Sequence, residues 1–469
     1  MNKNRLTLIV IIVLTALAGL AVWSGLSTHK SSIREAGKSA ETTPQNGNEA
    51  ADGSLEALAG RLELSPPVLD AIIRSIRDHG IPPLRVHQLL LQKKTEFNDL
   101  IGQMQPSKDG GESFTPHARE VLSALNAGDF DKARSLLQKV LSELEAGTVS
   151  PDKDPDLKAL TLARLGRLEN LQLEYKKAAD YFGQAAQAAQ KDSLALKSDL
   201  YGWQGTALFL AEDFEQAEKA YKESLTLAEK AFSPVHPAQV NALNNLAGLY
   251  RSTGRPKLAE PLYLKAMDIR QKALGPRHPS LAAPLSNLAS LYLEMGDYKQ
   301  AVILLENALA IREEALGPDD PSVAASLNNL ANVYQAVGNP DKAKELLLQS
   351  LDITRKALGP DHLRVAMTLN NLAKLSQRQG DDEGARARYL EALAISEKVL
   401  GPVHPDVAAI LINLAELDMK ADQLDKAEIL WRKAMTILEA TVGPEHPDVQ
   451  KIKEQLAQIR IANAKKSIQ

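Results

Sequence analysis

Apolar residues recur at spacings of three and four along most of the chain, which is the period of an amphipathic helix. Pro321 suits the first position of a helix, because its missing N–H would have no partner there. One apolar helical face follows, made of Leu327, Leu330, Ala331 and Tyr334. Gly338-Asn339-Pro340 ends that helix, and a second stripe follows at Ala343, Leu347 and Ile353. The pattern predicts two packed helices joined by a tight turn.

This unit repeats with a step of 42 residues. Gly-Pro connectors fall at Gly275, Gly317, Gly359, Gly401 and Gly443, and Ser233-Pro234 marks the preceding step. The first helices share an Asn-Leu-Ala motif that begins at Asn245, Asn287, Asn329, Asn371 and Asn413. The second helices share an alanine: Ala259, Ala301, Ala343, Ala385 and Ala427. Each helix pair buries one face on its partner and another on the next pair, so the sequence predicts an all-α solenoid.

Earlier units fit the pattern more loosely. "LGRLENLQLEYKKAADYFGQA", "GTALFLAEDFEQAEKAY" and "NAGDFDKARSLL" keep the small and large positions of the second-helix turn. We therefore predict about eight repeats over residues 114–446, with the regular period from 233 to 443, followed by a capping helix and tail over 447–469.

Residues 54–113 are predicted to form a small helical domain. In this domain, Ser65 is the expected N-cap of a helix with Pro66 in its first turn, and a longer helix follows Pro83. The stretch "LAGRLELSPPVLDAII" also resembles a helix-turn-helix, as in a membrane-anchored regulator. Residues 54–105 carry six basic and six acidic side chains, whereas a DNA reader needs a positive face. The structural interpretation is therefore favoured.

The N-terminus predicts a membrane anchor. Lys3 and Arg5 precede an apolar run over residues 6–26, long enough for a bilayer-spanning helix, with Trp23 near its far end. "Ala16-Leu17-Ala18" has the form of a signal-peptide cleavage site, so a cleaved signal sequence is the alternative. Residues 27–53 are polar and are predicted to form a disordered tether.

The anchor and the cleaved signal sequence would both place the repeats outside the cytoplasm. We expect a single-pass inner-membrane protein with a cytoplasmic N-terminus and periplasmic repeats.

The repeated motifs resemble the tetratricopeptide repeat, in the 42-residue form found in kinesin light chains and many bacterial proteins. The resemblance rests on the "NLA-x-x-Y" first helix, the turn at Gly296-Asp297-Tyr298 with Ala301, and the "LG-P-x-HP" connector. It implies a right-handed superhelical α-solenoid, whose first helices line a concave groove that binds peptide segments.

Polar positions of the first helices supply the predicted peptide-binding residues. Their spacing of three and four places them on one helical face, where amides and cations can hold a peptide backbone or acidic groups. These candidates are Asn244, Arg251, Asn328, Asn332, Gln335, Asn370, Lys374 and Gln377. The alternative is an ordinary solvated helix face. The repeated asparagines are instead expected to bond mainly to neighbouring repeats, because a residue required in every repeat is architectural.

The composition argues against several kinds of partner and chemistry. The net charge of −4 gives no support to a nucleic-acid partner, and the absence of cysteine excludes disulfides and thiolate chemistry. Histidines recur in the connectors at His236, His278, His362, His404 and His446. One histidine per repeat is too sparse for a zinc site, so these residues are expected to begin helices. At Asp320 the histidine is missing and the repeat continues, which supports this interpretation.

No phosphate-binding loop, metalloprotease motif or nucleophile elbow occurs, so the sequence predicts no enzyme, no metal and no cofactor. The predicted function is a membrane-anchored scaffold that binds peptide segments or proteins in the concave groove. The competing interpretation is a structural module that self-assembles into oligomers without a peptide ligand.

Overall fold

The computed structural model describes residues 62–79, 81, 83–104, 117–148, 155–441, 443–444 and 447–466. Within these ranges the chain is all-helical and contains no strand. The predicted anchor and tether, residues 1–53, lie outside the described residues. Among the helices that are described, none combines the length and the apolar character that a membrane span needs.

The chain divides into two compact units between Ile269 and Arg270, called here the first and second units. The first unit contains α3 (Pro66–Asp78), α4 (Pro83–Met104), α5 (Ala118–Asn126), α6 (Phe130–Glu145), α7 (Leu157–Leu171), α8 (Tyr175–Ala188), α9 (Leu194–Leu210), α10 (Phe214–Ala231) and α11 (Gln239–Ser252). Helix α12 (Pro256–Leu274) crosses the boundary. The second unit contains η2 (Pro279–Leu281), α13 (Ala282–Glu294), α14 (Tyr298–Leu316), α15 (Pro321–Ala336), α16 (Pro340–Leu358), α17 (Leu363–Arg378), α18 (Asp382–Leu400), α19 (Pro405–Lys420), α20 (Leu424–Thr441) and α21 (Pro447–Lys466).

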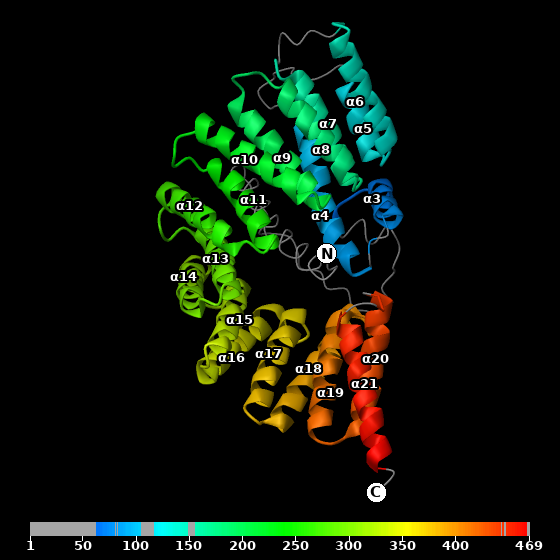
Figure 1. Ribbon diagram of the computed structural model, residues 1–469, viewed down its shortest axis with the longest axis vertical. Helices are drawn as coiled ribbons and strands as arrows, with labels where there is room; N and C mark the ends of the chain where they lie inside the picture. The colour runs from blue at the N-terminus through cyan, green and yellow to red at the C-terminus, as the bar shows by residue number, and fades with distance from the viewer. Residues whose placement is uncertain are drawn as a thin grey trace, which may run out of the picture. The chain divides into compact units, whose positions relative to one another are not determined.

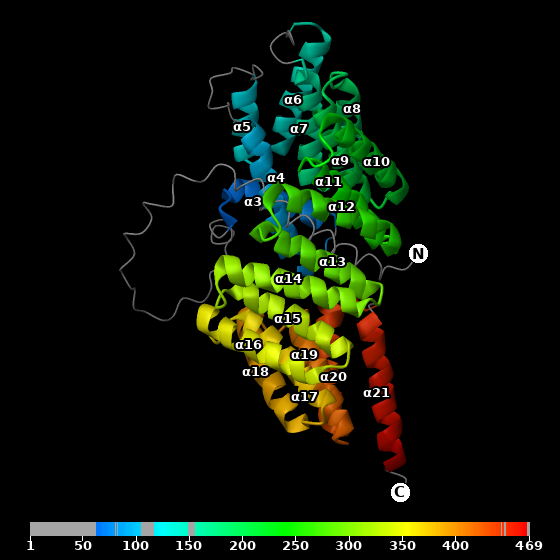
Figure 2. The same ribbon diagram turned by 90° about the vertical axis from the view of Figure 1, so that its left-hand side faces the viewer.

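Within each unit, successive helices pack as pairs, and each pair packs on the next (Figures 1 and 2). This stacking is the solenoid that the 42-residue period predicts. The pair α15–α16 shows its physical basis, because Ala331 and Ala343 are 0% exposed where the two helices meet. Leucines and valines of α15, α16 and α17 surround them in one continuous core. Small residues at the crossing allow the two backbones to approach closely, as the pattern predicted.

Each connector between repeats ends one helix and begins the next. Gly317 ends α14 with φ 86° and ψ 156°, a combination that is essentially restricted to glycine. Because ψ is 156°, the backbone of this C-cap residue is extended and does not have the left-handed helical conformation. Each connector histidine then accepts a hydrogen bond at Nδ1 from the backbone N–H two residues later. These histidines are His236, His278, His362 and His404, with N···N distances of 3.2, 3.3, 3.1 and 3.1 Å.

Asp320 accepts the same bond from Ser322 N–H at 2.7 Å. The carboxylate therefore replaces the imidazole at this connector. The role at helix starts that was predicted for the histidines is confirmed at the four described positions. Ser65 is the N-cap residue of α3, as predicted, but its hydroxyl makes no capping hydrogen bond. The hydroxyl donates instead to the carbonyl of Asn126 at 3.1 Å, so Ser65 joins α3 to the first repeat.

A charged network joins α10 to the α11–α12 turn in the first unit. Glu218 accepts hydrogen bonds from the Tyr250 hydroxyl at 3.1 Å and from Arg255 Nη1 at 2.7 Å, and Lys222 Nζ lies 2.8 Å from it. Burial raises the pKa of the Glu218 carboxyl, but the hydrogen bonds from Lys222 and Arg255 outweigh it and lower the pKa to about 2. Glu218 therefore stabilises the fold in its ionised form.

We expect Glu218→Gln to remove a pH-dependent part of the stability. Because the folded pKa lies below the usual value of 4.5, this contribution is present above about pH 4.5 and is lost as the pH falls towards about 2. The difference in urea midpoint between wild type and variant should be largest near pH 7 and shrink below pH 4.5. Glu215→Gln is the matched control, since Glu215 is 80% exposed and pairs with the exposed Lys219 of its own helix. An equal and pH-independent loss in both variants would contradict the assignment.

Candidate functional site

The first helices of the second unit share one solvent-exposed face. The face is called here the exposed row, and its residues lie at equivalent positions of α13, α15, α17 and α19. The row consists of Asn287 with Ser290, Asn329 with Asn332, Asn371 with Lys374, and Asn413 with Glu416. All eight side chains are exposed or half-exposed, while the leucines and alanines on the opposite face are buried. The row is therefore a polar surface backed by a rigid apolar core.

Two of the predicted peptide-binding residues, Asn332 and Lys374, belong to this exposed row. Asn328 instead points into the junction of α15, α16 and α17. Its Nδ2 donates to Ser350 Oγ at 2.6 Å and to Thr368 Oγ1 at 2.8 Å, and both acceptors are buried. Asn328 thus contributes to the packing of successive repeats.

The remaining predicted residues lie on the flanks of the first helices and are half-buried. Asn370 Oδ1 accepts from Asn413, Gln335 Oε1 accepts from Arg378 at 3.4 Å, and Gln377 Oε1 accepts from the Tyr389 hydroxyl at 3.1 Å. Asn244 and Arg251 lie on α11 in the first unit, also half-buried. A peptide-binding role for these residues stays a prediction.

The repeated asparagines bridge neighbouring repeats at two positions, as predicted. Asn371 Nδ2 donates to Asn328 Oδ1 at 3.2 Å, and Asn413 Nδ2 donates to Asn370 Oδ1 at 2.9 Å. These residues also belong to the exposed row, so the architectural and surface roles are not alternatives. Sequence reasoning separated the two roles because it had no information on how far each helix is rotated.

Helix α4 covers the equivalent face of α7 in the first unit. Lys93 is 0% exposed, and its ammonium donates to the Asn170 carbonyl at 2.6 Å and to Glu96 at 2.7 Å. Phe97 and Leu100 of α4 are buried in the same core as Leu165 and other leucines of α7. Every residue of α7 except Lys158, near its first turn, is consequently buried or half-buried. An amphipathic helix therefore fits against a first helix of this chain.

Beyond α4, a cavity of about 360 Å³ is lined mainly by α4, α7, α9 and α11, with Phe182 of α8 and Ser224 of α10. The Arg167 guanidinium stacks on the Trp203 ring, 4.2 Å from its centroid. Burial raises the pKa of the Asp99 and Asp199 carboxyls, while the charge of Arg167 opposes that rise. Sequence reasoning missed these residues, because no repeated motif marks them and α4 is far from α9 in the sequence.

Sequence models described as tetratricopeptide repeat match the chain over most of its C-terminal two thirds. One model matches residues 197–272, 241–314, 280–356, 322–398 and 365–418, and a second matches residues 407–448. The matches together span residues 197–448, which is more than half of the 469 residues. No curated protein sequence matches the chain.

Several solved structures are similar to parts of the chain. The kinesin light chain TPR-like repeats of Podosopora anserina are 28% identical, over 43% of this chain and 96% of theirs, with a TM-score of 0.39. BtubC (BKLC) from P. vanneervenii is 20% identical over 49% of this chain and 92% of its own, with a TM-score of 0.41. The quorum sensor NprR from B. thuringiensis is 16% identical over 82% and 99%, with a TM-score of 0.45.

Proposed function

Because the chain belongs to the tetratricopeptide repeat family, we propose that it acts as a protein–protein interaction scaffold. In this proposal, an extended or helical segment of a partner lies along the exposed row of the second unit. The amides of the row bond to the partner's backbone, and Lys374 meets an acidic side chain. No bond is made or broken, so the function is recognition alone.

One observation carries this proposal: the exposed row is polar, recurs at equivalent positions of four successive repeats, and stands on buried leucines and alanines. Regularly spaced amides on a rigid support suit the regular repeat of a peptide backbone. Support also comes from α4, which shows that an amphipathic helix packs against a first helix in the first unit.

We expect the double variant Asn332→Ala/Lys374→Glu to reduce partner capture roughly tenfold in a quantitative pull-down with the full-length chain. Both side chains are exposed, so the circular dichroism spectrum and the thermal midpoint should not change. The matched control is Gln349→Ala/Lys344→Glu, which likewise removes one amide and reverses one lysine charge, at exposed positions of the second helix α16. Equal capture by the two double variants would reject the exposed row as the binding surface.

Self-association is a second candidate, favoured by exposed apolar side chains on consecutive second helices. Leu348 of α16 is 45% exposed, Leu390 of α18 is 51% exposed, and Ile429 of α20 is 58% exposed. Light scattering over a range of concentrations tests self-association. A molar mass that stays at the monomer value at every concentration would reject it.

Membrane anchoring is a separate proposal that rests only on the apolar run over residues 6–26 and its flanking Lys3 and Arg5. We propose that this run anchors the chain in the inner membrane and leaves the repeats outside the cytoplasm. Reporter domains fused after residue 53 and after residue 469 would test it. Cytoplasmic activity of both reporters would reject the proposed topology.

A further inference from the structure

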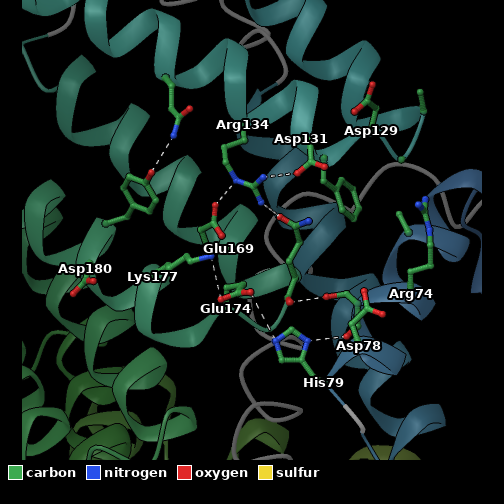
Figure 3. A pocket seen from close by; sticks show the side chains of 18 of the residues that line it. Arg74, Asp78, His79, Asp129, Asp131, Arg134, Glu169, Glu174, Lys177 and Asp180 are labelled. Carbon is green, nitrogen blue, oxygen red and sulfur yellow. Dashed lines mark hydrogen bonds and ion pairs between the residues drawn. The ribbon is translucent and has the colours of Figure 1, made fainter.

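A second, larger cavity of about 1170 Å³ lies within the first unit (Figure 3). It is lined by α3, the α5–α6 turn, α6, the end of α7, the α7–α8 turn and α8. None of its lining residues belongs to the exposed row or to the cavity beside α4. It is therefore a site separate from the exposed row.

The lining of this cavity carries an excess of negative charge. Its carboxylates are Asp78, Asp129, Asp131, Glu169, Glu174 and Asp180, and its fixed cations are Arg74, Arg134 and Lys177. The six carboxylates thus outnumber the three cations two to one. Such a surface attracts a cationic ligand and repels an anionic one.

The cations of the lining are already engaged. Arg134 binds Asp131 and Glu169, and Lys177 Nζ lies 3.4 Å from Glu174 (Figure 3). Arg74 pairs with Asp70, 3.1 Å away and outside the lining. Asp78 on α3 and Asp180 on α8 are exposed members of the lining.

A buried acceptor gives a second and independent indication of a ligand. Glu169 is 2% exposed and lines the cavity, and its Oε1 accepts from Arg134. Its Oε2 is buried without a hydrogen-bond partner in the described structure. A buried carboxylate oxygen without a donor is costly, and a donor supplied by a ligand would remove that cost.

The dimensions and lining favour a peptide over a single ion. Among the described residues, no group of three or more histidine, aspartate and glutamate side chains is arranged to hold a metal. The volume exceeds the range of about 300–1,000 Å³ that is typical of small-molecule sites. Ala71, Phe130 and Tyr181 add apolar surface on which the aliphatic stem of a lysine can pack.

We propose that this cavity binds a lysine-rich or arginine-rich segment of a partner protein. The cationic groups of the segment pair with Asp78 and Asp180, and one of them donates to Glu169 Oε2. The scaffold would then engage two chemically different segments, one in each unit.

Fluorescence anisotropy with the purified full-length chain tests this proposal. The labelled ligand is a synthetic peptide of alternating lysine and alanine, and glutamine replaces lysine in the reference peptide. We expect the lysine peptide to bind more tightly than the glutamine peptide, and its affinity to fall as the salt concentration rises from about 0.05 M to about 0.5 M. Equal binding of the two peptides would overturn the proposal.

Variants locate the binding. Asp78→Asn/Asp180→Asn should weaken binding of the lysine peptide roughly tenfold, and Gln138→Arg should weaken it by placing a cation in the cavity. The control Asp341→Asn/Glu397→Gln makes the same change in net charge at exposed positions of the second unit and should bind as wild type does. A similar loss in the control would show diffuse attraction and overturn the assignment. Asn332→Ala/Lys374→Glu should leave this binding intact, which separates it from the function of the exposed row.

Discussion

Replacing Arg134 with alanine is expected to lower the free energy of unfolding of the first unit by about 3–5 kcal/mol. The guanidinium links α6 to α7, because it donates to Glu169, to Gln172 and to Asp131. Glu169 is only 2% exposed, so the variant leaves a buried carboxylate without its charge partner. An unpaired buried charge costs far more than the lost hydrogen bonds of the arginine itself.

Urea denaturation measures the loss, and hydrogen exchange localises it to the amides of α6 and α7. Asp131→Asn is the control, because Asp131 is 85% exposed and its pairing with Arg134 should contribute at most about 1 kcal/mol. Adding Glu169→Gln to Arg134→Ala removes the unpaired charge and should restore part of the stability. If this double variant is no more stable than Arg134→Ala, the buried charge is not the cause.

Tyr389→Ala is expected to destabilise the second unit by a similar amount, about 3–5 kcal/mol. Tyr389 is 0% exposed in α18 and belongs to the continuous core formed with Leu369 and Leu372 of α17. Removing its ring leaves a cavity that the surrounding helices can close only partly. Because each repeat of a solenoid contacts only its neighbours, the loss of protection should be largest in α17 and α18.

Tyr389→Phe separates the ring from the hydroxyl. This variant keeps the packing and removes only the hydrogen bond to Gln377, so it should cost about 0.5–1.5 kcal/mol. Thermal or urea unfolding of the two variants would compare them. If phenylalanine is as damaging as alanine, the hydrogen bond to Gln377 determines the stability and the packing argument is wrong.

The sequence predicted the helix pairs because their signals are local and recur at every step of 42 residues. Pro321 and Asn339 stand next to the helices that they begin, and the connector histidines and Asp320 bond to N–H groups only two residues away. Such signals need no knowledge of the tertiary structure. For this reason the helices from α13 onwards follow the predicted pattern closely.

The residues of the exposed row could not all be identified from the sequence. Spacing placed Asn328, Asn332 and Gln335 on one helical face, but a face is wide, and only Asn332 of the three lies in the exposed row. Asn328 and Gln335 are rotated towards the next repeat, where they bond to Thr368 and Arg378. Periodicity identifies a face, whereas the packing of the next helix decides which of its residues remain accessible.

The sequence by itself determined the all-helical repeat, its period, its connectors and its buried stripes. Only the tertiary structure decided that α4 covers α7 and that an acidic cavity lies beside α3. These features depend on contacts between distant residues: Lys93 meets the carbonyl of Asn170, and Ser75 donates to the carbonyl of Gln172, 97 positions away. Neither contact leaves a period in the sequence, because each occurs once and follows from how whole helices pack.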